Sequence, residues 1–144
     1  MLILHSFGFW CLSLDEGYYA ETLLMISPDH IFFHEAFAVV CALHWACHSS
    51  VEGLCCIVIC LDSTNMVDIF NLLKASGIYN NLLMFAVLLL MQADIDLHIV
   101  HISGDLNCIA DHLLHFRLDK ARLVHPVLQI FHYQPLAVLA EAAL

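Results

Sequence analysis

Three carboxylates stand where they could carry out metal-dependent chemistry. Asp62 follows a long apolar run, while Glu35 and Asp111 each lie within a segment of helical character. Carboxylates suit Mg²⁺ and Mn²⁺, and two such ions can clamp the attacking and leaving oxygens of a phosphodiester. If the fold brings them together, Glu35, Asp62 and Asp111 could therefore hold two divalent cations and act on a phosphodiester.

Each of these carboxylates also has an ordinary structural explanation. Asp62 precedes three residues of helix N-cap type, Ser63 to Asn65, and could simply cap the next helix. Glu35 could lie at the rim of a helix face, and Asp111 could be a solvated helix residue. Local sequence leaves these alternatives open.

The segment Leu54 to Leu61 is expected to be a buried strand that ends on Asp62. It is a continuous apolar run of strand length with several β-branched residues. Such runs are typical of strands that are covered on both faces. Open α/β sheets carry their chemistry at the carboxyl ends of strands, so Asp62 is the first residue expected in a site.

The other elements follow from the spacing of apolar residues. The spacing predicts helices over Ile31 to His48, Asn65 to Ala75, Ile78 to Met91 and Leu106 to His115. It predicts strands over Met1 to His5, Phe7 to Leu14, Tyr18 to Ile26 and Leu97 to Ile102, and an extended piece near Val127 to Tyr133. The first three strands are expected to form an antiparallel meander. This order indicates an α/β domain with a mixed five-stranded sheet and helices on both faces.

Composition indicates one apolar domain inside the cell. The 144 residues suffice for one real core, and 62% of them are hydrophobic against 12% charged. No segment is a clear membrane span, because the apolar centre Leu82 to Met91 is about half of the roughly 20 residues that a span needs. The N-terminus lacks the basic start and cleavage site of a signal peptide. We therefore expect an intracellular protein, cytoplasmic or nuclear, without a membrane partner.

Charge argues against unaided binding to a phosphate backbone. The chain has 4 basic and 14 acidic residues and a net charge of −10, whereas such binding depends on Lys and Arg. Three of the basic residues lie between Arg117 and Arg122, a small patch expected at a solvated helix end. The 7 cysteines lack zinc spacing and are expected to be buried, reduced thiols. The 11 histidines match no recognised zinc pattern either.

Three motifs occur in the order and spacing of ribonuclease H-like domains. The segment Glu35-Ala36-Phe37-Ala38-Val39 with Ala42-Leu43 resembles their E-x-x-A-V-x-x-A-L helix. Leu61-Asp62-Ser63, followed by Val67 and Asn71, resembles their T-D-S strand end and following helix. The third motif, similar to H-I-P-G-x-x-N-x-x-A-D-x-L, comprises His101-Ile102-Ser103-Gly104, Asn107 and Ala110-Asp111-His112-Leu113. The run from about Phe7 onward, including Ala121-Arg122, His125-Pro126 and Gln134-Pro135 in the tail, is similar to the domain that follows reverse transcriptase in fungal retroelements.

The resemblance implies a ribonuclease H-like fold over residues 1–116, with residues 117–144 as the C-terminal extension of the retroelement branch. It implies that Glu35, Asp62 and Asp111 are catalytic and bind Mg²⁺ or Mn²⁺, and that the substrate is the RNA strand of an RNA/DNA hybrid. The family's fourth carboxylate, an Asp on the first strand, is absent, and the register puts it at about Met1. Asp15 lies on the wrong side of the second strand, so the role does not transfer to it.

The shortened first strand has two expected consequences. That strand is central in the family's fold, so part of the Leu54 strand should lack a backbone partner. Its Asp normally bridges both metals, so metal affinity and nuclease activity should be weak or absent. The serine-arginine that usually follows A-D-x-L is also replaced, by Leu114-His115. We therefore expect a retroelement fragment or a relic that begins inside the first strand.

Three functions remain open at this point. The first is a metal-dependent nuclease that uses Glu35, Asp62 and Asp111. The second is a catalytically inactive ribonuclease H-like interaction module, self-associating through the apolar helix Ile78 to Met91. The third, unrelated to the family, is an apolar ligand- or lipid-binding domain.

Overall fold

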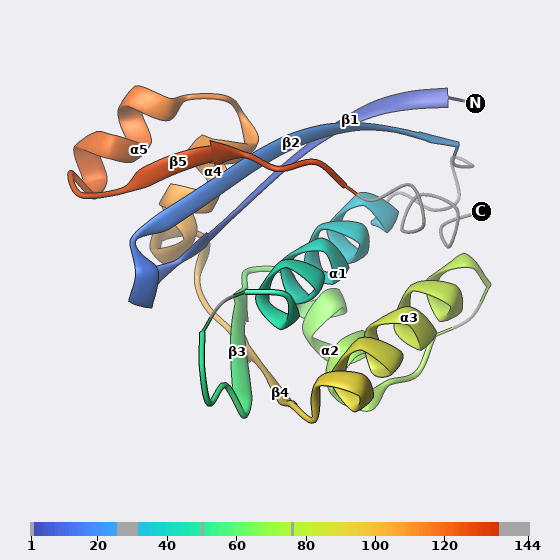
Figure 1. Cartoon of the computed structure of the whole chain (residues 1–144). Helices are drawn as coiled ribbons and strands as arrows, with labels where there is room; N and C mark the ends of the chain where they lie inside the picture. The colour runs from blue at the N-terminus through green and yellow to red at the C-terminus, as the bar shows by residue number, and fades with distance from the viewer. Residues whose placement is uncertain (1, 26–31, 50, 76, 136–144) are drawn as a thin grey trace.

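The computed structural model describes residues 2–25, 32–49, 51–75 and 77–135, which form five strands, five α-helices and two short 3₁₀ helices. In chain order these are β1 (Leu2–Cys11), η1 (Leu12–Leu14), β2 (Glu16–Met25), α1 (Phe33–Cys47), β3 (Cys56–Leu61), α2 (Thr64–Leu72), α3 (Ile78–Ala93), β4 (Asp96–His101), η2 (Gly104–Asn107), α4 (Cys108–Leu114), α5 (Leu118–Val124) and β5 (Gln129–His132). Figure 1 shows their arrangement. The predicted mixed α/β class is confirmed, as are four predicted helices to within a few residues of their described ends.

Strands β1 and β2 form one long antiparallel hairpin. Leu2 pairs with Met25 and Cys11 with Glu16, and every position between has a partner. The predicted three-stranded meander is therefore wrong, because its first two strands are a single element. The chain reverses through η1 and Asp15, which takes a left-handed φ of 53° that Asp tolerates better than most residues.

The five strands lie in two separate sheets. One has the order β1-β2-β5, with β5 parallel to β2, and the other pairs β3 with β4 in parallel. A mixed sheet is thus confirmed, but a single five-stranded sheet is wrong. The residues expected as a central first strand instead begin β1, and among the described strands β3 pairs only with β4.

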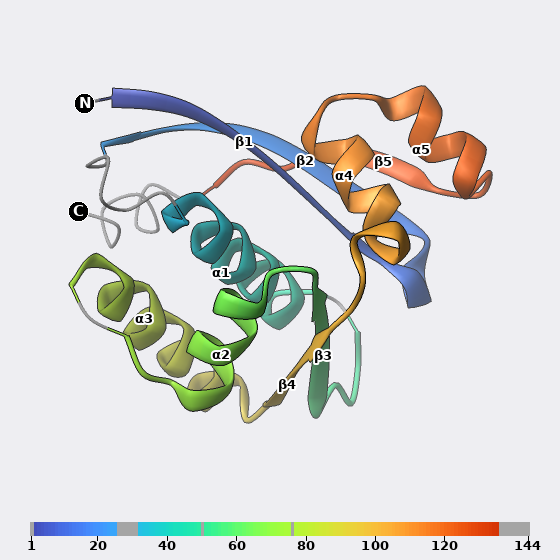
Figure 2. The ribbon, with the colours of Figure 1, turned by 180° about the vertical axis from the view of Figure 1, so that it is seen from behind.

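Helices α1 and α4 cover opposite faces of the β1-β2-β5 sheet (Figures 1 and 2). Phe7 of β1 packs against Phe37 of α1 with ring centroids 6.0 Å apart. The next residue, Gly8, faces α4, where an added Cβ would lie 2.6 Å from Leu113 Cβ and 2.7 Å from the Leu114 amide nitrogen. The missing side chain is what allows α4 to approach the strand so closely.

The main core lies around α1, which packs along α3. Its fully buried side chains include Phe33, Phe37, Val40 and Leu43. Helix α2 covers the inner face of the β3–β4 sheet. A smaller cluster formed by Ile109, Leu113, Ala121 and Leu128 holds α4 and α5 together.

The outer face of the β3–β4 sheet is open to solvent. Side chains of β3 alternate between exposed and partly covered, and Val58 and Val100 are 58% and 45% exposed. The prediction of a strand covered on both faces is wrong, because α2 packs on one side only. All seven cysteines are free, but Cys55, Cys56 and Cys60 are exposed rather than buried.

Helix α3 is the most apolar of the described helices, and some of its apolar side chains are exposed to solvent. It has 16 residues, and no helix of the described part of the chain is long and apolar enough to cross a membrane. Met84, Leu88 and Met91 recur at helical spacing and are 57%, 54% and 72% exposed. One face of α3 therefore packs on α1, while another offers apolar side chains to solvent.

Candidate functional site

Asp62 lies at the carboxyl end of β3, where its side chain is exposed. Ser63 occupies the N-cap position of α2, although its side chain makes no capping hydrogen bond, so the alternative that Asp62 itself is the N-cap is wrong. The Ile102 amide donates to Leu61 O at 2.8 Å, which brings the end of β4 beside the end of β3. The Asp62 carboxylate consequently faces Gly104, where an added Cβ would lie 3.9 Å from Oδ2.

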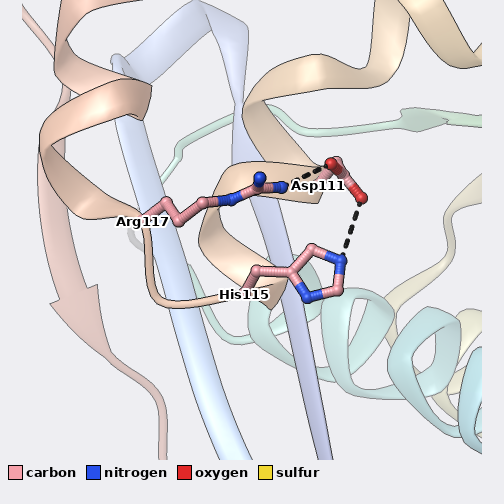
Figure 3. Close-up of polar contacts among 3 residues, drawn as sticks. All are labelled: Asp111, His115 and Arg117. Atoms are coloured by element: carbon pink, nitrogen blue, oxygen red, sulfur yellow. Dashed lines mark hydrogen bonds and ion pairs between the residues drawn. The ribbon is translucent and has the colours of Figure 1, made fainter.

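Asp111 lies on the exposed side of α4 and is bound by two side chains that follow it in sequence (Figure 3). Arg117 Nη2 donates to Asp111 Oδ2 at 2.9 Å. His115 Nε2 lies 3.4 Å from Asp111 Oδ1 and adds a charged partner when the imidazole is protonated. Both carboxylate oxygens therefore already face nitrogen atoms.

The turn between α4 and α5 positions Arg117. Phe116 takes a left-handed φ of 56°, and the Arg117 amide donates to His112 O at 2.8 Å. This geometry directs the guanidinium back over α4 toward Asp111. An aromatic residue at positive φ is uncommon, so the surrounding packing must hold this turn.

Glu35 lies in the first turn of α1, close enough to Tyr79 of α3 for its charge to act on the Tyr79 hydroxyl. Its Oε2 is buried and accepts no hydrogen bond from the described residues. Burial, together with the negative charge of Glu35, raises the pKa of Tyr79 on α3.

The three carboxylates do not form one metal-binding group. Within the described ranges, no cluster of three or more His, Cys, Asp or Glu side chains could hold a metal ion. Asp111 is moreover held by an arginine, a cation that competes with a metal for the same oxygens. The arrangement therefore does not fit the two-metal site that the resemblance implies.

Sequence reasoning missed a contact made by Asp15. Its Oδ1 lies 2.6 Å from His125 Nε2, although the two residues are 110 positions apart. The His125 ring also lies against Trp10, with centroids 5.5 Å apart. No local pattern signals this pair, which ties the β1–β2 turn to the segment between α5 and β5.

A second missed cluster, only partly buried, joins α1 to Tyr133, the residue that follows β5. The Tyr133 hydroxyl lies 3.4 Å from His44 Nδ1, and His44 stacks on His48 with centroids 4.3 Å apart. Burial raises the pKa of the Cys41 thiol and of the Tyr133 hydroxyl, while burial and the charge of His48 lower the pKa of His44. All three shifts favour the neutral forms, so this cluster holds no activated nucleophile.

Comparisons with protein-family models, curated proteins and solved structures find no match for this chain.

Proposed function

We propose that this chain is a retroelement-derived ribonuclease H-like domain that has lost metal-dependent nuclease activity and acts as an interaction module. The order of the three motifs supports the descent. The observation that best supports the loss of activity is the contact between Arg117 and Asp111, because a metal ligand must offer free lone pairs to the ion. An intracellular location, cytoplasmic or nuclear, belongs to the same proposal, and the seven free thiols support it.

Arg117 weakens metal binding at Asp111 mainly because it places a positive charge beside the carboxylate, and not because the ion pair itself is strong. Both side chains are partly exposed, so the pair itself stabilises the fold by no more than about 1 kcal/mol. A guanidinium at 2.9 Å nevertheless places a positive charge where a divalent cation would have to bind. An ion at Asp111 would have to bind against the repulsion of this guanidinium or displace it.

The first strand supports the same conclusion. Leu2–Cys11 contains no acidic residue, so β1 brings no carboxylate toward Asp62. Strands β1 and β3 lie in different sheets. Among the described strands, the β3–β4 sheet therefore lacks the central first strand on which the metal site of ribonuclease H-like domains is built. Asp62 thus lies at a strand end without its expected neighbour.

The surface offers contacts suited to binding another macromolecule. Met84, Leu88 and Met91 form an exposed apolar stripe on α3. Methionine side chains adapt their shape to different partners, and such stripes are typical of binding surfaces. This stripe supports the interaction role and the self-association expected for the helix Ile78 to Met91.

The test is cleavage of a labelled RNA/DNA hybrid with Mg²⁺ or Mn²⁺. Wild type, Asp62→Asn and Asp111→Asn are compared after circular dichroism has shown that all three fold alike. We expect the three proteins to give the same background. Cleavage by wild type that either substitution abolishes would overturn the proposal.

The nuclease remains the second candidate because Asp62 is exposed at the carboxyl edge of β3 and β4. In that case the Asp62 carboxylate would take part in cleavage of the hybrid. Cleavage that depends on Asp62 in the assay above would establish it.

A further inference from the structure

Helix α3 is uncharged over its whole length, in a chain whose net charge is −10. Its exposed stripe, Met84, Leu88 and Met91, lies along the centre of the solvent-facing side. The stripe is flanked by exposed side-chain amides, those of Asn80, Asn81 and Gln92. Two copies can approach each other at this surface without the repulsion that carboxylates would cause there.

The stripe is open to a partner. Helix α1 packs on the opposite side of α3, where Leu82 and Ala86 are buried. In both views α3 lies at the outside of the molecule (Figures 1 and 2). Beside Met91 the apolar surface continues into an open groove of about 400 Å³, where the ends of α2 and α3 meet the start of β4. Leu73 of this groove is 53% exposed and extends the stripe sideways.

The stripe has the same order of side chains when it is read in reverse. Leu88 lies near its middle, with Met84 one turn before it and Met91 one turn after it. If two α3 helices lie antiparallel about a twofold axis near Leu88, the two leucines meet, and Met84 of each copy lies opposite Met91 of the other. Apolar residues spaced by four and then three positions are typical of helices that pair along one seam.

The two ends of α3 complement each other in this antiparallel arrangement. The first turn of a helix carries partial positive charge and the last turn partial negative charge. Asp94 ends α3 as an exposed residue, so each copy places this carboxylate beside the first turn of the other. Asn80 lies in that turn, and its side-chain amide retains a second N–H beyond the one near Met84 Sδ at 3.7 Å. A parallel pair would instead bring the two Asp94 carboxylates together.

We propose that two copies of this chain associate through antiparallel α3 helices. Leu88 lies at the axis, Met84 packs against the second copy's Met91, and Asn80 donates a hydrogen bond to the second copy's Asp94. This pairing rests on the interaction role proposed above and identifies its partner as a second copy. The same surface is used on both sides, so the contact closes as a dimer.

The size of the contact sets its strength. The stripe covers about two turns, roughly 10 Å of helix. Interfaces that bury less than about 1,200 Å² in total are weak. We therefore expect a dissociation constant on the order of 10–100 μM.

Sedimentation velocity of the full chain, over a concentration series that reaches about 200 μM, tests the dimer. Leu88→Asp places two like charges at the axis and is expected to weaken dimerisation about tenfold or more. Leu12→Asp and Leu123→Asp, at residues 68% and 81% exposed on η1 and α5, are the matched controls and should dimerise like wild type. Circular dichroism of each variant excludes unfolding as the cause.

A pair of double variants tests the orientation. Met84→Lys with Met91→Glu puts opposite charges across from each other only if the helices are antiparallel. Met84→Lys with Met91→Lys puts like charges there in either orientation, although it makes the chain less negative overall. The first variant should therefore dimerise about tenfold more tightly than the second.

Four results would overturn this pairing. They are a wild type that stays monomeric throughout, a wild type that forms oligomers larger than a dimer, unchanged dimerisation of Leu88→Asp, and two double variants that dimerise equally. The hybrid-cleavage assay, run on the same proteins, separates the two proposals. Cleavage would overturn the inactive role and leave the dimer, whereas a monomer without cleavage would remove only the dimer.

Discussion

Arg117 binds Asp111 back across the α4–α5 turn, with Nη2 at 2.9 Å from Oδ2. The two residues are six positions apart, and the left-handed Phe116 between them makes the approach feasible. The carboxylate that the family resemblance predicts as a metal ligand is thus engaged in an ion pair at the protein surface. The neighbouring guanidinium, and not only the presence of an Asp at this position, therefore determines how well the carboxylate can bind a metal ion.

Removing the guanidinium tests this relationship. Arg117→Ala should raise Mn²⁺ affinity by no more than about fivefold, since an exposed pair is worth about 1 kcal/mol or less. Hybrid cleavage should stay absent, because Glu35 and Asp62 do not join Asp111 in one group. Mn²⁺ titration followed by electron paramagnetic resonance measures the affinity, with Arg122→Ala as the control. Cleavage that appears in Arg117→Ala and disappears with added Asp62→Asn would show that the guanidinium alone blocks an assembled site.

The Asp15–His125 pair should couple the hairpin turn to the C-terminal segment. Asp15→Asn keeps the left-handed turn and removes the charge, while His125→Gln removes the imidazole. We expect a coupling free energy of about 0.5–1 kcal/mol in a double-mutant cycle, because the pair is only partly buried. Urea unfolding of the four proteins measures it, and strictly additive effects would show that the contact is energetically neutral.

Gly8 should tolerate no side chain. Gly8→Ala places a methyl group against Leu113 Cβ and the Leu114 backbone, so α4 must move away from β1. Overpacking of this kind costs about 1–3 kcal/mol of unfolding free energy. Gly104→Ala is the control, because its nearest new contact, Asp62 Oδ2, is at 3.9 Å. Thermal unfolding compares the two, and equal stability would mean that α4 does not lie against β1 as described.

His44 should make the fold less stable in acid. Burial and the neighbouring His48 lower the pKa of His44, so the unfolded chain binds a proton more readily than the folded one. The contribution of His44 to the free energy of unfolding is then fully present above about pH 6.5. It is lost progressively as the pH falls from there toward the lowered pKa of the folded state. Protonation would also stop Nδ1 from accepting a hydrogen bond from the Tyr133 hydroxyl.

His44→Gln should therefore lose less unfolding free energy than wild type between about pH 7 and pH 5. Urea unfolding at the two pH values measures the difference. His98→Gln, at an exposed position of β4, is the control and should behave like wild type. An equal loss in wild type and His44→Gln would exclude His44 as a source of the acid sensitivity.

Sequence by itself determined the local elements. The apolar spacing over Ile31 to His48 predicted α1, and the run after Leu54 predicted β3 with Asp62 at its end. Such patterns are local because a helix or strand repeats over a few residues and buries one stripe or face. The inward packing of Phe33, Phe37 and Val40 follows directly from that repeat.

Tertiary structure decided how these elements combine. The pairing of β1 with β2 along its whole length, and of β3 with β4 alone among the described strands, divides the predicted sheet in two. Strand pairing joins residues far apart in sequence, and a local pattern does not specify which edge each strand meets. The same holds for Asp15 with His125 across 110 positions, and for the groove where α2, α3 and β4 meet. Asp62 could thus be placed at a strand end from sequence, but only the fold determined which neighbours it has there.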